Sequence, residues 1–215
     1  HALLGNVGLS LESTALASMQ IANTNSDGSY ALLIPDEGAY RVEASKSLSS
    51  LETGDVISAS CALAALKLSV GINPNSDPDG PGPLGTPPVS PYQFLAADVN
   101  DDGRVSAADA LAILKMALKR SDAPARQWLI VDEAHDFWNE NAANGGAFNT
   151  TRSTVPKDAT MPQSVDITEG SPLNLVAVLK GDVNASWIAP TGSAILPDSY
   201  FQALVGGSPL TMNLA

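Results

Sequence analysis

The feature that most constrains this chain is a run of oxygen-bearing side chains at alternate positions. Asp98, Asn100 and Asp102 alternate, and Gly103 comes directly after them. A sharp bend would turn the three side chains toward one centre, and glycine tolerates the backbone angles that such a bend requires. A helical pattern follows at once, with Ser106 as a candidate N-cap. The segment therefore predicts a metal-binding loop in front of a helix.

The twelve residues from Asp98 to Asp109 match the ligand spacing of an EF-hand-type calcium loop. Calcium takes about six to eight oxygens, which such loops supply from positions 1, 3, 5, 7, 9 and 12. Arg104 stands at position 7, where the backbone carbonyl is the ligand, and Asp109 stands at position 12, where most EF-hands have Glu. The predicted Ca²⁺ ligands are Asp98, Asn100, Asp102, Arg104 and Asp109.

Two helical stretches are near-copies of one another. The hexapeptides 62–67 and 110–115 differ at one position, and their offset is 48 residues (110 minus 62). Ser58 and Ser106 are the expected N-caps. Leucine or valine recurs with helical spacing in both, at Leu63, Leu66 and Val70 and at Leu111, Leu114 and Leu118. The sequence thus predicts helices over 58–70 and 106–119 and an internal duplication.

The loop with Asp at position 12 and the following A-L-x-x-L-K helix resemble the type I dockerin repeat. The resemblance implies two loop–helix units, residues 50–70 and 98–119, without the entering helix of a full EF-hand. It also implies two calcium ions and docking onto cohesin domains. Aligning the helices places Ser50, Glu52, Gly54 and Cys61 at positions 1, 3, 5 and 12 of the first loop, so that loop is expected to bind calcium poorly. The cohesin-reading positions 10 and 11 hold Ala107 and Ala108.

Residues 1–48 have the alternation of half-buried strands. Val7, Leu9 and Leu11 alternate, and Asp27-Gly28 is typical of a tight hairpin turn. The runs 26–32 and 38–42, S-D-G-S-Y-A-L and G-A-Y-R-V, resemble the carboxypeptidase regulatory-like β-sandwich. That resemblance implies an Ig-like domain without catalytic residues of its own.

The rest of the chain is predicted to be loop and strand. A Pro/Gly loop over 71–91 completes the dockerin-like region 49–121, and its Asp77 and Asp79 could add metal ligands. Region 122–215 is expected to be β-rich, with strands at 128–131, 165–167 and 173–179 and a tail after Pro197 that could be helix or strand. Asp182 and Asn184 repeat the start of a calcium loop, and could cap a turn or join the Asp98 site from outside. The predicted fold class is therefore mixed β and α: an Ig-like sandwich, a dockerin-like helix pair and a β-rich C-terminal region.

Charge and residue usage exclude several kinds of function. The chain has 23 acidic and 11 basic side chains and a net charge of −12, so it would repel nucleic acid. A single cysteine, Cys61, excludes an intrachain disulfide, and no apolar run is long enough to span a membrane. His1 and His135 are the only histidines, so a zinc site and a Ser-His-Asp triad are not expected.

These observations together predict a non-enzymatic protein. The expected role is a calcium-stabilised extracellular or cell-surface module that binds a protein partner, either a cohesin-like domain or another copy of the chain. Two alternatives stay open: a repeating structural subunit of an extracellular fibre or matrix, and a non-catalytic fragment of a secreted carbohydrate-active enzyme.

Overall fold

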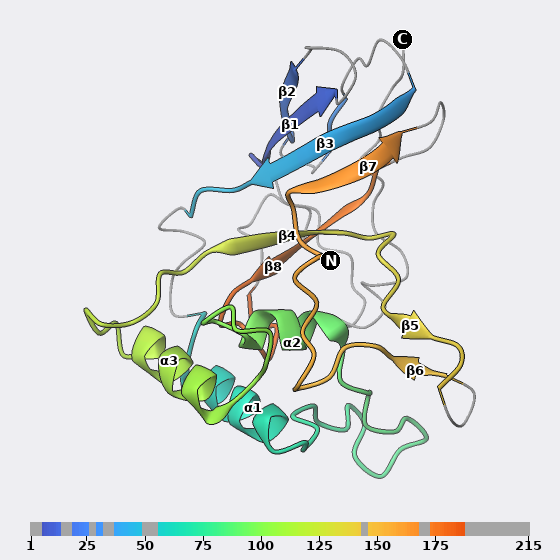
Figure 1. The fold of residues 1–215 in the computed structure, drawn as a ribbon. Helices are drawn as coiled ribbons and strands as arrows, with labels where there is room; N and C mark the ends of the chain where they lie inside the picture. Colours follow the sequence, from blue (N-terminus) through green and yellow to red (C-terminus); the bar gives the residue numbers. More distant parts are fainter. Residues whose placement is uncertain are drawn as a thin grey trace.

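A computed structural model describes residues 6–13, 19–25, 29–31, 37–48, 56–142, 146–167 and 173–187. It combines antiparallel sheets with helices, which confirms the predicted mixed class in this coarse form (Figure 1). The elements are β1 (Gly8–Ser13), β2 (Met19–Asn23), β3 (Gly38–Ser45), α1 (Ala59–Ser69), α2 (Pro91–Ala97), α3 (Ala107–Ala117), β4 (Trp128–Asp132), β5 (Trp138–Asn139), β6 (Ala147–Phe148), β7 (Gln163–Ile167) and β8 (Leu175–Leu179).

A four-stranded antiparallel sheet in the order β2-β1-β3-β7 forms one end of the molecule (Figure 1). Its inner face buries Leu9, Leu11 and Val42, as the alternating pattern predicted. Strand β7 comes from far along the chain and pairs with β3, so the N-terminal sheet is completed by a later segment. The predicted Asp27-Gly28 turn lies outside the described residues.

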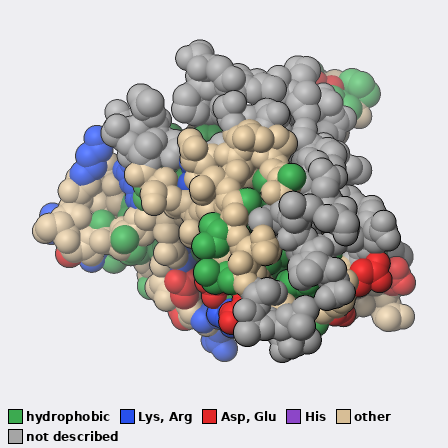
Figure 2. Space-filling view, turned by 90° about the horizontal axis from the view of Figure 1, so that it is seen from above, with side chains coloured by type: hydrophobic (Ala, Val, Ile, Leu, Met, Phe, Trp, Pro, Cys, Tyr) green, Lys and Arg blue, Asp and Glu red, His purple; other side chains and the backbone are tan. Residues whose placement is uncertain are grey.

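Basic and acidic side chains both reach the surface at this end of the molecule (Figure 2). Arg41 and Glu43, both on β3, form an ion pair of 2.9 Å there. Each of the two side chains is about half exposed, and pairs of this kind contribute little to stability because water competes for both charges.

Strands β4 and β8 form a second, two-stranded sheet beneath the first one. Their registers pair Leu129 with Val178 and Val131 with Val176. The strands predicted at 128–131, 165–167 and 173–179 are therefore all present, the last beginning at Leu175. A short hairpin of β5 and β6 lies to one side, and the tail after Pro197 lies outside the described residues.

Helices α1 and α3 pack against each other through small side chains, and the predicted N-caps Ser58 and Ser106 precede them. The buried side of α1 is built from residues such as Cys61, Ala65 and Leu68. Alanine at these positions allows the two helix backbones to approach closely. The same core extends through Ile113, Met116, Val131, Val178 and Val183 to the strands β4 and β8 and to the loop beyond them.

Helix α2, which lies between α1 and α3 in the chain, was not predicted from the sequence. Ser90 caps it, Pro91 occupies its first position, and the Gln93 side chain accepts a hydrogen bond from the Ser90 amide at 3.0 Å. Serine before proline with glutamine at the third position is a helix-start signal that the Pro/Gly-rich context obscured. Because α2 ends at Asp98, a helix does enter the candidate calcium loop, contrary to the expectation from the dockerin repeat.

Residues 71–90 form neither helix nor strand, as predicted for a Pro/Gly loop. Asn75 ties the two ends of this loop together by donating to the carbonyls of Pro87 and Pro88 at 3.2 and 3.0 Å. Within the described part of the chain, no helix has the length and apolar character needed to cross a membrane.

Candidate metal centre

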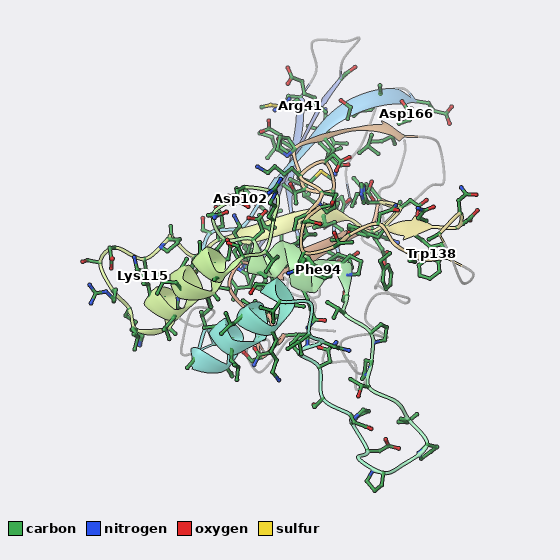
Figure 3. The ribbon with its side chains drawn as sticks, turned by 60° about the horizontal axis from the view of Figure 1, so that its bottom comes forward. Arg41, Phe94, Asp102, Lys115, Trp138 and Asp166 are labelled. Carbon is green, nitrogen blue, oxygen red and sulfur yellow. The ribbon has the colours of Figure 1, made fainter. Side chains whose placement is uncertain are left out.

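The predicted ligand loop closes on itself through backbone amides that point at carboxylates. Asp98, the residue that ends α2, accepts from the amide of Asp102 at 3.1 Å and from that of Gly103 at 2.9 Å. The Asn100 side chain also accepts from the Asp102 amide, at 2.9 Å. Positions 1, 3 and 5 of the loop are thus turned toward one another. Asp102, at position 5, lies near the helices and β4 (Figure 3).

Asp109 joins the far end of the loop to its beginning. One of its oxygens accepts from the Asn100 amide at 3.3 Å, and the other accepts from the amide and the hydroxyl of Ser106 at 3.0 and 2.9 Å. The structure therefore brings position 12 to the same centre as positions 1 and 3. The carboxylate also caps α3, because Ser106 and Asp109 form a reciprocal capping box.

Two residues of the loop have left-handed backbone angles. Asp101 has φ of 59° and Gly103 has φ of 82°. The first is tolerated because aspartate accepts this region more readily than most residues, and the second is the bend for which glycine was predicted. The bend at Gly103 is therefore one that the sequence identified correctly.

A strap of residues 151–157 lies along the outer edge of the loop. The Val105 amide donates to the Arg152 carbonyl at 2.7 Å, and the Val155 amide donates to the Gly103 carbonyl at 2.9 Å. The Arg104 amide points the other way and donates to Asp102 at 2.9 Å. The carbonyl of Arg104 and the amide of Val105 belong to one trans peptide and point in opposite directions, so the Arg104 carbonyl is directed away from the strap and toward the loop.

Two of the loop carboxylates are deeply buried, with exposed fractions of 4% for Asp98 and 0% for Asp109. Burial raises the pKa of Asp98, and the negative charges of Asp109 and Asp102 raise it further. The amides of Gly103 and Asp102 act in the opposite direction. Within the described residues, neither Asp98 nor Asp109 forms an ion pair with a lysine or an arginine. Buried negative charge of this kind is costly unless a cation compensates it.

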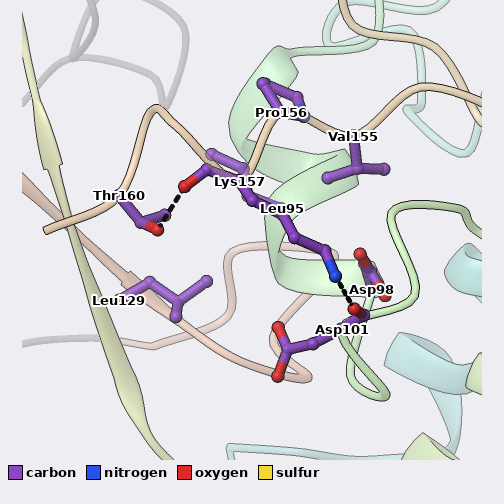
Figure 4. Close-up of a pocket in the computed structure, with 8 residues that line it drawn as sticks. All are labelled: Leu95, Asp98, Asp101, Leu129, Val155, Pro156, Lys157 and Thr160. Atoms are coloured by element: carbon purple, nitrogen blue, oxygen red, sulfur yellow. Dashed lines mark hydrogen bonds between the residues drawn. The ribbon is translucent and has the colours of Figure 1, made fainter. Parts of the chain in front are cut away.

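The basic groups near the loop lie at position 4 instead. Lys180 is buried and its ammonium group lies 2.5 Å from an oxygen of Asp101, while Lys157 donates to the Asp101 carbonyl. Lys157, Thr160 and Asp98 line a cavity of about 160 Å³ on this side of the loop (Figure 4). Both lysines therefore contact position 4 of the loop, and neither pairs with a described residue at a predicted ligand position.

The donor set fits a hard cation. In their present rotamers, the described side chains hold no group of three or more His, Cys, Asp or Glu near enough to share a metal. The oxygens of Asp98, Asn100, Asp102 and Asp109 and the Arg104 carbonyl nevertheless converge on one loop. Both oxygens of Asp98 and the Asp109 oxygen that faces Asn100 keep a free lone pair beside their hydrogen bonds, whereas the other Asp109 oxygen accepts two bonds from Ser106. Oxygen-only donors of mixed charge are those that Ca²⁺ prefers.

The other candidate ligands lie elsewhere. Asp77 accepts from the Asp79 amide at 3.2 Å, and Asp79 accepts from the Leu84 amide at 3.1 Å, so both serve turns within the Pro/Gly loop. Asp182 and Asn184 meet Cys61 at the start of α1. The sequence did not identify Lys180 or the strap, because their contacts with the loop join residues about 50 to 80 positions apart.

Comparison with known proteins returned no match among protein-family models, curated proteins or solved structures.

Proposed function

We propose that this chain is a calcium-stabilised extracellular module that docks onto a protein partner. The observation that carries the calcium part is the pair of buried carboxylates, Asp98 and Asp109, in a closed loop of oxygen donors without a basic partner in the described residues. Ca²⁺ would neutralise these charges and join α2 to α3 through one centre. A cation that binds only the folded state raises stability with its concentration.

The helix pair and its loop support a dockerin-like reading of residues 49–121, and the four-stranded sheet supports an Ig-like reading of the N-terminal region. Two helices of one sequence pattern pack together beside the loop, as the resemblance implies. The predicted strands at the N-terminus pair in an antiparallel sheet. A protein partner and an extracellular location follow from these resemblances and form part of the proposal.

The docking part is supported by a leucine stripe on the outer faces of α1 and α3. This stripe consists of Leu63, Leu66, Val70, Leu111 and Leu118, all of which are exposed. The buried faces of the two helices consist mostly of residues other than leucine. The leucines that recur with helical spacing are therefore mostly not part of this chain's own core. Large apolar side chains gathered on two adjacent helices mark an interaction surface.

The charge of the stripe indicates the chemistry of its partner. Lys67 and Lys115 lie within it, one turn from Leu63 and Leu111 respectively. Lys115 also forms a partly exposed ion pair of 3.0 Å with Asp122, beyond the end of α3. The only acidic residue of the two helices is Asp109, which is buried, whereas the whole chain carries a net charge of −12. A basic apolar surface on an acidic protein fits a partner surface that is apolar and rimmed by carboxylates. A cohesin-like domain with such a rim is the partner that we propose.

Calorimetry of Ca²⁺ binding tests the calcium part on the wild-type chain and on the double variant Asp98→Ala/Asp109→Ala. One site should be present in the wild type and absent in the variant, and chelator should lower the melting temperature of the wild type alone. Asp166→Asn, an exposed carboxylate on β7, is the matched control. A wild type that neither binds Ca²⁺ nor responds to chelator would refute this part.

Sedimentation of the chain mixed with a cohesin-type domain tests the docking part. Leu63→Ser/Leu111→Ser should abolish the complex without changing the melting temperature, because both side chains are exposed. Leu84→Ser, an exposed leucine on the Pro/Gly loop, should leave the complex intact. Equal binding by both variants would exclude the leucine stripe as the docking surface.

A second candidate function, a repeating structural subunit, is favoured by strand β2. This strand is an edge of the four-stranded sheet and exposes Met19 and Ile21. An apolar edge strand is a template for pairing with another chain. Concentration-dependent assembly of the chain alone, lost in Ile21→Lys, would favour this function over the docking module.

A further inference from the structure

Helices α1 and α3 begin in the same way, although only α3 follows a contiguous ligand loop. In α3 the Ser106 amide donates to Asp109 at 3.0 Å, and in α1 the Ser58 amide donates to the Cys61 sulfur at 3.5 Å. Cys61 therefore occupies in α1 the place that the position-12 carboxylate occupies in α3.

The segment 182–187 faces this end of α1 and repeats the hydrogen bonding of the first half of the candidate calcium loop. Asp182 accepts from the amides of Ser186 and Trp187, four and five residues later, both at 2.9 Å. Asp98 accepts from the amides four and five residues later, at 3.1 and 2.9 Å.

The backbone angles of the two segments agree as well. The fourth residue is left-handed in both, with φ of 53° at Ala185 and 59° at Asp101. Alanine rarely adopts this region, so its presence here reflects the conformation that the surrounding contacts impose. Residues 182–187 therefore have the backbone of a calcium-type half-loop.

Contacts with α1 supply the second half. The Ser186 hydroxyl donates to the Val56 carbonyl at 2.9 Å, which places Val56 where the loop around Asp98 has Arg104. The Cys61 thiol donates to the Asn184 side-chain oxygen at 3.0 Å and lies 3.8 Å from an oxygen of Asp182. Positions 1, 3, 5, 7 and 12 are thus Asp182, Asn184, Ser186, Val56 and Cys61.

We infer that residues 182–187 and 56–61 are the two halves of a second, discontinuous calcium-type loop, and that Cys61 is the residue that keeps it from binding Ca²⁺. This inference deepens the proposed function, because it rests on reading the loop 98–109 as a calcium loop. It also revises the alignment from sequence, which drew positions 1, 3 and 5 from Ser50, Glu52 and Gly54, residues that lie outside the described ones.

The residues present at this second loop do not fit Ca²⁺. A thiol is a soft ligand, whereas Ca²⁺ takes oxygen. The Cys61 S–H also engages the Asn184 oxygen that a cation would need. Only one carboxylate, Asp182, stands in the ligand positions, whereas the loop around Asp98 has three. Hydrogen bonds therefore hold the two halves of the second loop together without a metal ion.

Calorimetry of Ca²⁺ binding to the full chain tests the inference. Cys61→Asp/Ser186→Asp gives the second loop the same side-chain set as the loop around Asp98, and binding should rise from one ion per chain to two. Ser186→Asp alone is the matched control, because it adds a carboxylate but keeps the thiol, and it should bind one. Two ions on this control or on the wild type, or a cooperatively folded double variant that binds no more ions than the wild type, would overturn the inference.

The same calorimetry distinguishes failure of this inference from failure of the proposed function. A wild type with no site and a double variant with one would refute the calcium function of the Asp98 loop and uphold the inference about Cys61. Adding Asp98→Ala to the double variant should leave one ion bound, at the second loop.

A measurement on the unmodified cysteine covers the case in which the double variant does not fold. The Raman S–H stretching band of the wild type should move to higher frequency in Asn184→Ala, because the thiol loses its shortest acceptor and keeps only the longer contacts to the Val56 carbonyl at 3.5 Å and to Asp182 at 3.8 Å. An unchanged band would show that the thiol does not close the loop and would overturn the inference.

Discussion

At the scale of the residue, Lys180 is the most unusual side chain in the described structure. It is only 2% exposed, and its ion-pair partner Asp101 is a largely exposed residue. Burying an ammonium group costs solvation that one partner at the surface repays incompletely. Lys180 thus combines a packing role for its stem with an electrostatic role behind the candidate calcium loop.

Separating these two roles is possible with a pair of substitutions. Lys180→Met keeps the volume and removes the charge, so the free energy of unfolding in chelator should stay equal or rise. Lys180→Ala should lower it by about 2–5 kcal/mol, because it leaves a cavity. Urea unfolding measures both values. A strongly destabilised Lys180→Met would show instead that the ion pair holds the loop.

Asp102 is a position where the proposed calcium site can be weakened without harming the fold. It is exposed, and asparagine keeps the oxygen that accepts from the Arg104 amide. Removing one ligand charge in Asp102→Asn should weaken Ca²⁺ binding about tenfold or more, or about 1.4 kcal/mol. Stability in chelator should change by about 0.5 kcal/mol or less, because the one bond lost, from the Asn100 side chain, is exposed. An equal loss of affinity in the control Asp166→Asn would point to general charge rather than coordination.

Asp182 should make the free energy of unfolding depend on pH, and the direction of its pKa shift gives the sign of that dependence. Burial raises its pKa, and the amides of Trp187 and Ser186 only partly oppose this. The folded state therefore holds this proton more tightly than the unfolded chain does, and the resulting stability is present at low pH and lost as the pH rises through the folded pKa.

The free energy of unfolding of the wild type relative to Asp182→Asn should accordingly fall as the pH is raised from about 4, the ordinary aspartate pKa. Urea unfolding in chelator at several pH values measures the slope. The two proteins should also differ in free energy of unfolding by an amount that does not change with pH, because asparagine cannot accept all the hydrogen bonds of Asp182. The readout is therefore the change of this difference with pH and not its absolute size. A flat or rising difference would contradict the burial effect.

At the scale of the element, each of the duplicated helices has large apolar side chains turned outward, and α1 turns mainly small residues inward. On α1, Leu63 is exposed while Leu68, five residues later, is buried. Leu68→Ala should cost about 2–5 kcal/mol of unfolding free energy, whereas Leu63→Ser should change it by about 0.5 kcal/mol or less. Thermal and urea unfolding would compare them. Equal costs would mean that the stripe is covered by the chain itself.

At the scale of the whole molecule, the helices and the C-terminal strands share one core. Val131, Val155, Val178 and Val183 all join the cluster that contains α1 and α3. A fragment of residues 49–121 lacks these side chains together with the strap. We therefore expect this fragment not to unfold cooperatively, with or without Ca²⁺. Calorimetric melting of the fragment beside the full chain is the test, and a sharp transition in the fragment would show that it is an independent domain.

The sequence by itself determined the local features: the ligand spacing from Asp98 to Asp109, the bend at Gly103, the serine caps of α1 and α3, and most strands. Each depends on residues within about twelve positions of one another, so local preferences and periodicity are sufficient. Helix α2 escaped because its short pattern lay beside a proline-rich stretch, although Ser90, Pro91 and Gln93 carried the signal.

Only the tertiary structure decided which segments meet. The sequence marked the helical leucine pattern but not that its leucines face solvent, because periodicity defines a face without saying what covers it. It marked Asp182 and Asn184 as resembling the start of a calcium loop but not that both contact Cys61 of α1, 121 residues before Asp182. Pairing across such a distance depends on how the whole core packs, and no local preference records it.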